Sequence, residues 1–237
     1  MLTSHPEIEM PPDNSMIWRY LDIERLLTML NDKALFLCRL DNFRDPWEGS
    51  WPQSVIDGIR THWPADSQRF FTNTSINVRR FHFVNCWYES PTESAELWDL
   101  YAANSGVAIQ STIGLLKSSI TDEKDYFVGR VRYVNFEIEP SPSLNLLVPP
   151  FLKRKSFEHE REVRVLHWGL PHDEKGIQWE QVASHHKLSI DPNILIERLH
   201  VSPSSPEWLF PAIREFCVRF QISAPVVRSS LYDPRVY

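Results

Sequence analysis

The sequence predicts an α+β fold: a single domain in which mixed or antiparallel sheets surround a polar cleft and short helices flank the sheets. Its 237 residues, of which 42% are hydrophobic and 24% charged, suit one large globular domain. The expected strands do not alternate regularly with helices of crossover length, which disfavours a doubly wound or barrel α/β fold. Because the sequence has no internal repeat and no clear linker, we expect a flexible N-terminal segment over residues 1–15 and one domain over residues 16–237.

Capping residues and hydrophobic spacing predict the helices. Asp22 is expected to cap a helix in which Ile and Leu recur every three or four positions. Ser94 and Thr112 are expected to cap two more short helices. Ser204 with Glu207 forms a capping-box pattern before the last helix. Strands are expected at 16–20, 34–38, 81–88, 107–111, 127–136, 160–168, 186–190, 198–202 and 225–229, with a polar helical stretch up to about residue 72.

The cysteines indicate a reducing compartment. Cys38, Cys86 and Cys217 lie within apolar runs, and their odd number and wide spacing argue against a disulfide framework. We interpret them as reduced core residues and expect a cytoplasmic protein. The first seventeen residues lack the basic start and apolar run of a signal peptide. No stretch approaches the roughly 20 apolar residues that cross a bilayer.

Charge and missing motifs narrow the chemistry. The net charge of −6 disfavours general nucleic-acid binding, and the short basic run 153–155 is more typical of a solvated helix end than of a binding patch. The glycine-rich nucleotide loops, the serine nucleophile elbow and the common zinc motifs do not occur. His185 and His186 would point to opposite faces of a strand, so we expect no metal site there.

A charged strand is the strongest chemical signal. In a strand over 160–168, Glu160, Glu162 and Arg164 share one face, while Val163 and Val165 share the other. One interpretation is a solvent-exposed sheet face with a ladder of ion pairs. The other is a catalytic pair of carboxylates in a cleft, where the arginine keeps one of them ionised. Such a carboxylate can stabilise the positive charge that develops when a glycosidic bond breaks, in a sugar or in NAD.

Several segments, spread over most of the chain, together carry a family resemblance. They are Trp18-Arg19-Tyr20, the loop from Asn42 to Glu48, the strand Val84-Asn85-Cys86-Trp87, the helix from Leu97 to Ala102, Gly106-Val107-Ala108-Ile109, and Phe157-x-x-Glu160-x-Glu162-x-Arg164. In this order and spacing they resemble the bacterial Domain of Unknown Function 2971 family. The opening of that family is in turn similar to ADP-ribosyltransferases, which implies an ADP-ribosyltransferase-like fold with NAD as a substrate.

The resemblance also implies roles for individual residues. Arg19 matches the first-strand His or Arg that holds the nicotinamide half of NAD, and Tyr20 follows it where many relatives have His-Tyr. Glu160 or Glu162 matches the late glutamate that binds the ribose and stabilises the transition state, with Arg164 beside it. The aromatic residue that stacks on nicotinamide would be Trp98 or Tyr101, and core packing is the alternative role for both.

The first loop holds two further acidic residues. Asp45 and Glu48 are expected to form a capped turn, because Asp-Pro sets the backbone, or else the rim of a cleft that contacts the target.

Together with the charged strand, the resemblance implies an NAD-consuming ADP-ribosyltransferase or NAD glycohydrolase, of the kind that acts in bacterial or phage conflict. The acceptor would be a protein, a nucleic acid, a small molecule or water. A non-catalytic nucleotide- or peptide-binding module and a carboxylate-dependent hydrolase are the alternatives. We further expect Arg19 to lie near Glu162, and Glu162→Gln to abolish activity without loss of stability, because neighbouring carboxylates repel.

Overall fold

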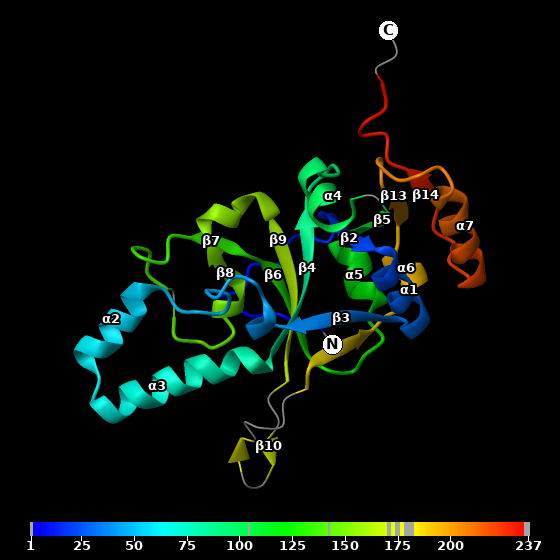
Figure 1. Cartoon of the computed structure of the whole chain (residues 1–237). Coiled ribbons are helices and arrows are strands. Elements are labelled where there is room, and N and C mark those ends of the chain that lie inside the picture. The colour runs from blue at the N-terminus through cyan, green and yellow to red at the C-terminus, as the bar shows by residue number, and fades with distance from the viewer. Residues whose placement is uncertain are drawn as a thin grey trace. The chain divides into compact units, whose positions relative to one another are not determined.

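The computed structural model describes residues 2–103, 105–141, 143–169, 172–173, 176–177 and 183–234. The chain divides into two compact units, each built from segments far apart in sequence (Figure 1). The first unit consists of Met1–Met10, Phe36–Cys86 and Lys124–His186, and the second of Pro11–Leu35, Trp87–Glu123 and Lys187–Tyr237. The expectation of one domain over 16–237 stays a prediction.

The second unit contains three strand pairs, of which two are antiparallel and one is parallel. β2 (Met16–Asp22) pairs antiparallel with β5 (Gly106–Thr112), which pairs antiparallel with β13 (Arg198–Val201). β13 also pairs in parallel with β14 (Val226–Arg228). The helices of this unit are α1 (Ile23–Asp32), α4 (Ala95–Tyr101), α5 (Ile113–Ser119), α6 (Pro192–Leu195) and α7 (Leu209–Arg219).

The first unit contains the strands that matter for the candidate site. β1 (Leu2–Thr3) pairs in parallel with β6 (Tyr126–Arg130), and β6 pairs antiparallel with β9 (Glu162–Trp168). β7 (Arg132–Val134) pairs in parallel with β8 (Leu152–Arg154). Its long helices are α2 (Gln53–His62) and α3 (Ala65–Val78). The parallel and antiparallel pairs, with the helices, confirm the prediction of mixed sheets.

The remaining elements are short or have residues in both units. β3 (Ala34–Arg39), β4 (His82–Glu89) and β12 (His185–Ser189) have residues in both. The short helical turns are η1 (Leu40–Asn42), η2 (Arg79–Phe81), η3 (Pro149–Phe151) and η4 (Lys155–Glu160), and β10 (His172–Asp173) pairs with β11 (Gly176–Ile177).

Three of the predicted helix caps are confirmed. The side chain of Asp22 accepts a hydrogen bond from the backbone N–H of Arg25 at 2.8 Å, so α1 begins where the sequence indicates. Ser94 and Thr112 accept in the same way at the starts of α4 and α5. The capping box at Ser204 is wrong, because α7 begins at Leu209 without a side-chain cap. Pro211 lies in its first turn, where a missing N–H breaks no hydrogen bond.

Two predicted strands differ from the structure. The strand over 127–136 is interrupted at Val131, whose backbone N–H donates to the carbonyl of Glu162 at 2.8 Å, so β6 and β7 join different partners. The strand over 160–168 begins only at Glu162, because Glu160 ends η4 and Arg161 has a left-handed backbone with φ of 39°. Glu160 is therefore not on the strand face on which the sequence placed it.

The N-terminal residues contact strand β6. Besides β1, this segment contains Ile8, which is buried against Leu40, Val84, Phe151 and Leu166. A Cβ atom at Gly129 on β6 would lie 2.2 Å from Cγ2 of Ile8, so the close approach requires glycine there. Flexibility of residues 1–15 stays a prediction, although these contacts hold its first part.

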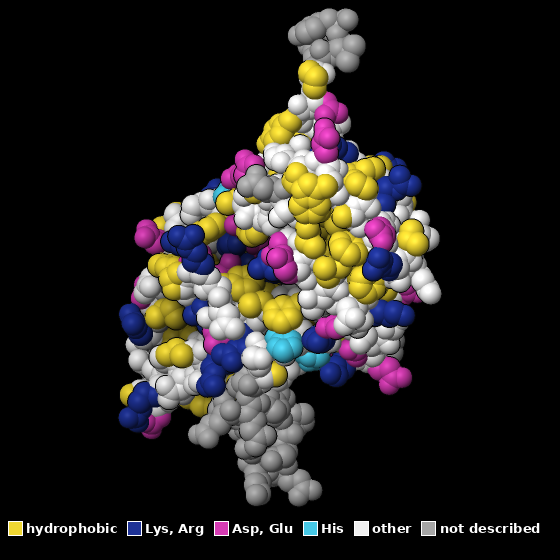
Figure 2. Space-filling view, turned by 45° about the vertical axis from the view of Figure 1, so that its right-hand side comes forward, with side chains coloured by type: hydrophobic (Ala, Val, Ile, Leu, Met, Phe, Trp, Pro, Cys, Tyr) yellow, Lys and Arg dark blue, Asp and Glu magenta, His cyan; other side chains and the backbone are white. Residues whose placement is uncertain are grey.

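The cysteines are free thiols, as expected, but only Cys217 is fully buried, while Cys38 and Cys86 are partly buried. Hydrophobic side chains are exposed among charged ones on the face shown in Figure 2. Within the described ranges, no helix combines the length and apolar character needed to span a membrane. The cytoplasmic location stays a prediction.

The cap of α1 supports a direct test. Asp22→Ala removes the acceptor for the N–H of Arg25 and should lower the free energy of unfolding by about 1 kcal/mol. Asp22→Asn keeps an acceptor oxygen and is the matched control, with a loss of a few tenths of a kcal/mol at most. Urea denaturation followed by circular dichroism measures both, and equal losses in the two variants would contradict the capping role.

Candidate functional site

Arg164 is the centre of a buried charged cluster in the first unit. Nη1 and Nη2 donate to the two carboxylate oxygens of Glu48 at 2.9 and 3.1 Å, and Nε donates to Oε2 of Glu162 at 2.6 Å. Nη1 also donates to the carbonyl of Pro150 at 2.6 Å, and the ring of Phe43 lies 5.6 Å from Cζ. A guanidinium removed from water is stable only with such partners, so Arg164 holds the loop of Glu48 against β9.

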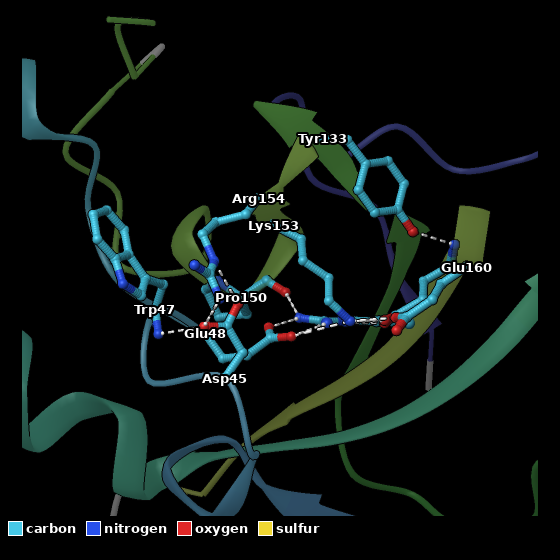
Figure 3. Close-up of polar contacts among 10 residues, drawn as sticks. Asp45, Trp47, Glu48, Tyr133, Pro150, Lys153, Arg154 and Glu160 are labelled. Atoms are coloured by element: carbon cyan, nitrogen blue, oxygen red, sulfur yellow. Dashed lines mark hydrogen bonds and ion pairs between the residues drawn. The ribbon is translucent and has the colours of Figure 1, made fainter. Parts of the chain in front are cut away.

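Lys153, on β8, is the second buried cation of the cluster (Figure 3). Its Nζ lies 2.5 Å from Oε1 of Glu162 and 3.2 Å from Oε1 of Glu48, and it forms an ion pair with Glu160. With Arg164, two cations therefore meet three carboxyl groups. If all three carboxyl groups were ionised, the cluster would carry one excess negative charge in a site with little water to stabilise it.

Glu160 reaches the cluster by a turn rather than along a strand. The left-handed backbone of Arg161 lies between Glu160 and Glu162, and both carboxyl groups contact Lys153. A left-handed conformation costs a residue other than glycine about 1–2 kcal/mol. The ion pair between Glu160 and Lys153 offsets part of that cost. The Glu160 side chain is 13% exposed, against 7% for Glu162 and 1% for Glu48, which makes it the most accessible carboxyl group of the cluster.

The two neighbouring carboxyl groups differ in pKa. Burial raises the pKa of Glu160 to about 7, and the hydrogen bond and charge of Glu162 act in the same direction. Burial also acts to raise the pKa of Glu162, but the charge of Arg164, the hydrogen bond from Glu160 and the charge of Lys153 together lower it well below its usual value. Glu162 is therefore ionised at neutral pH, whereas Glu160 is poised to gain or lose a proton there.

Neutral groups complete the surroundings of Glu162. The hydroxyl of Tyr133 accepts a hydrogen bond from the backbone N–H of Glu162 at 2.8 Å. Burial, together with the charge of Glu162, raises the pKa of Tyr133 and of the Cys86 thiol. Both groups keep their protons at neutral pH, so they add no further negative charge to the cluster.

A second ion pair lies beside the cluster. Arg154 donates from Nη2 and Nε to the carboxylate of Asp45 at 2.9 and 3.1 Å, and its guanidinium lies near the rings of Trp47 and Phe157. Asp45 also accepts from the backbone N–H of Trp47 at 3.1 Å, which confirms the capped turn. The role of this loop as a rim that contacts a target stays a prediction.

The burial of the cluster contradicts the solvent-exposed ladder. Glu162 and Arg164 are as well buried as Val163 and Val165, so both faces of β9 are covered. The three predicted residues do come together, Glu162 with Arg164 directly and Glu160 through Lys153.

Lys153 was missed because its run of three basic residues suggested a solvated helix end.

The residues expected to bind NAD lie in the second unit. The ring of Tyr20 is buried and contacts the ring of Trp98 edge to face at 5.0 Å, and Trp98 donates from Nε1 to Glu93 at 2.8 Å. Both aromatic residues therefore belong to the core, as the alternative interpretation held for Trp98. Tyr101 is exposed, and Arg19 is partly buried on the opposite face of β2 from Tyr20. Binding of NAD by these four residues, and proximity of Arg19 to Glu162, stay predictions.

The surface of each unit contains a pocket. One in the first unit, of about 420 Å³, is lined by Lys124, Asp125, Phe127, Leu147, His167 and Trp168. One in the second unit, of about 540 Å³, is lined by Leu27, Thr28, Asn31, Asp32, Phe216, Arg219 and Phe220. Neither contains a residue of the charged cluster, so a cleft at the cluster stays a prediction. Within the described part of the chain, no group of three or more His, Cys, Asp or Glu side chains is arranged to hold a metal ion.

No protein-family model and no curated protein matches the sequence. A solved structure to which the chain is similar is that of Thermus sp. 2.9 DarT in complex with ADP-ribosylated ssDNA, with a TM-score of 0.40 and 13% sequence identity, covering 94% of this chain and 97% of that chain. Membership of the Domain of Unknown Function 2971 family stays a prediction.

The cluster reverses the expectation for the stability of Glu162→Gln. The substitution leaves Arg164 and Lys153 with one fewer negative charge in a buried site, and it should lower the free energy of unfolding by about 3 kcal/mol. Glu158→Gln, an exposed glutamate in η4, is the matched control and should change it by less than about 0.5 kcal/mol. Urea denaturation at pH 7 measures both. An unchanged or increased stability of Glu162→Gln would contradict a supporting role for Glu162.

The raised pKa of Glu160 gives stability a defined pH dependence. Between the unfolded-state pKa near 4.5 and the folded-state value of about 7, the folded chain holds the proton more tightly, so stability falls as pH rises through this window. Glu160→Gln should remove this term, so the variant should gain about 1–3 kcal/mol relative to the unsubstituted chain between pH 4.5 and 8. Comparison with a variant is needed because buried His82, whose pKa burial lowers to about 3, gives a stability that rises with pH over an overlapping range. A difference between the two proteins that does not vary with pH would contradict the raised pKa.

Proposed function

We propose that the chain is an NAD-consuming, ADP-ribosyltransferase-like enzyme in which Glu160 is the carboxyl group that acts on the ribose. The observation that supports this proposal is the division between two adjacent carboxyl groups. Glu162 is ionised and fixed by Arg164 and Lys153, whereas Glu160 is the most accessible carboxyl group of the cluster and has a pKa of about 7. Active sites commonly hold such pairs, with one group as a support and the other as the reacting group.

The proposed chemistry requires one negative charge beside the ribose of NAD. The bond between the ribose C1′ and the nicotinamide nitrogen breaks, and its electron pair leaves with neutral nicotinamide. The ribose becomes oxocarbenium-like, and an ionised Glu160 would stabilise this positive charge and accept a hydrogen bond from a ribose hydroxyl. An acceptor, or water, then attacks C1′ and loses a proton. Glu162, which is fixed by two cations, would add to the negative field without contacting NAD.

The resemblance assigns the remaining roles in this proposal. Arg19 would hold the nicotinamide half of NAD, with Tyr20 beside it, and Tyr101 is the exposed candidate for stacking on the nicotinamide ring. Trp98 would act through its packing on Tyr20. A protein, a nucleic acid, a small molecule or water would be the acceptor, and single-stranded DNA belongs among the acceptors to be assayed.

A binding module without catalysis is the second candidate, and one observation favours it. Glu48, Glu162 and Arg164 satisfy one another inside the unit, as structural ion pairs do. In that case the cluster would hold the loop of Glu48 in place for a ligand, and NAD would remain intact.

Release of nicotinamide from NAD separates these candidates. The chain should release nicotinamide, with or without single-stranded DNA or protein acceptors, and Glu160→Gln should reduce the rate a few hundredfold, which corresponds to about 3–4 kcal/mol of transition-state stabilisation. Because ionised Glu160 is the active form, the rate should rise with pH and level off above about pH 7. Chromatographic detection of nicotinamide measures both effects.

The matched control is Glu158→Gln, which alters an exposed glutamate two residues away in η4 and should keep full activity. Full activity of Glu160→Gln would contradict the catalytic role of Glu160 and would indicate that another group performs it. Absence of nicotinamide release with every acceptor would favour the binding module.

A further inference from the structure

We infer that Lys153 is the positioning residue for Glu160: its ammonium group ties the end of η4 to the buried carboxylates of Glu162 and Glu48. The inference rests on the proposed role of Glu160 for its functional meaning, but its physical content is independent of NAD. Lys153 would not contact the substrate. It would act by fixing where the Glu160 carboxyl group lies and which charge state it prefers.

The contacts of Lys153 support this inference. Its Nζ meets one carboxyl group from each of three segments: Glu160 at the end of η4, Glu162 at the start of β9, and Glu48 in the loop before α2. The ring of Phe157, also in η4, lies 4.8 Å from Nζ. One side chain on β8 therefore makes two contacts with η4 and two with the rest of the cluster.

The segment that carries Glu160, η4, lies at the surface and contacts β7 and β8. None of the residues of η4 is fully buried, and the left-handed backbone of Arg161 at its end costs free energy. A short helical turn without a buried side chain has little hydrophobic burial to stabilise a single position. The ion pair of Lys153 with Glu160, and the contacts of the Phe157 ring with Lys153 and Arg154, contribute to holding it there.

The charges around Glu160 determine how it responds when Lys153 is changed. The titratable and charged groups of the cluster are Lys153 on β8, Glu162 and Arg164 on β9, Glu48 in its loop, Tyr133 on β7 and Cys86 on β4. Arg164 donates to Glu162 and Glu48, and among the ion pairs of the described residues it is Lys153 that pairs with Glu160. Replacing Lys153 with an uncharged side chain would leave Glu160 beside the negative charge of Glu162, and the neutral form of Glu160 would be favoured.

The test compares Lys153→Met with Arg154→Met. Both substitutions remove one cation from β8 and one contact with the Phe157 ring, but Arg154 pairs with Asp45, whereas Lys153 pairs with Glu160. In protein labelled with ¹³C at glutamate side-chain carboxyl carbons, and with the Glu160 signal assigned by Glu160→Gln, the midpoint of Glu160 should rise by about one to two pH units in Lys153→Met. It should stay within a few tenths of a unit in Arg154→Met.

A second measurement, on the unsubstituted chain, tests the inference even if Lys153→Met does not fold. In the unsubstituted chain, the ¹⁵Nζ signal of Lys153 should change with pH at the same midpoint as the Glu160 carboxyl carbon, because the two groups form an ion pair. A Lys153 signal that stays constant through the Glu160 titration would overturn the inference. So would an unchanged Glu160 midpoint in a folded Lys153→Met variant.

Activity separates this inference from the proposed function. Lys153→Met should release nicotinamide about five- to fiftyfold more slowly at pH 7, should regain about half of the rate or more near pH 9, and should have an almost unchanged KM. A general loss of structure would not recover at high pH. If the unsubstituted chain releases no nicotinamide, the proposed function fails, whereas the two titrations still decide the role of Lys153.

Discussion

The burial of Arg164 is the constraint on which the candidate site depends. A guanidinium group cannot lose its charge at any pH that the folded chain meets, so its removal from water has to be matched by negative groups and carbonyl oxygens. Glu48, Glu162 and Pro150 supply them from a loop, a strand and a short helical turn. These segments are thereby held in one arrangement, and the positions of Lys153 and Glu160 follow from it.

The cluster contains more carboxyl groups than cations, and this inequality determines the pKa of Glu160. Two cations balance two carboxylates, and a third carboxyl group remains. That third group is Glu160, whose pKa is raised to about 7, while Glu162 stays ionised. A fully balanced cluster would be inert support. The odd carboxyl group is what distinguishes a candidate reactive site from an ordinary buried ion-pair network.

The sequence predicted local features well and the environment of the site poorly. Asp22, Ser94 and Thr112 begin helices because their capping hydrogen bonds involve residues only three positions away, which a sequence shows directly. Glu160, Glu162 and Arg164 do lie together, but the strand begins two residues later than expected, since no residue type marks Arg161 as left-handed. Lys153 could not be assigned, because its burial arises from pairing with a loop about a hundred residues earlier and with β9, and neither contact leaves a local pattern.

The close contact between Gly129 and Ile8 has a consequence for how the chain tolerates change. Position 129 admits no side chain while the N-terminal residues remain in place, since even a methyl group would overlap Ile8. An alanine there and a shortened N-terminus are thus linked substitutions, in which the second relieves the first. Homologues that carry a larger residue at this position should therefore differ in their first ten residues as well, and a sequence comparison that treats the start of the chain as a dispensable tail would overlook that covariation.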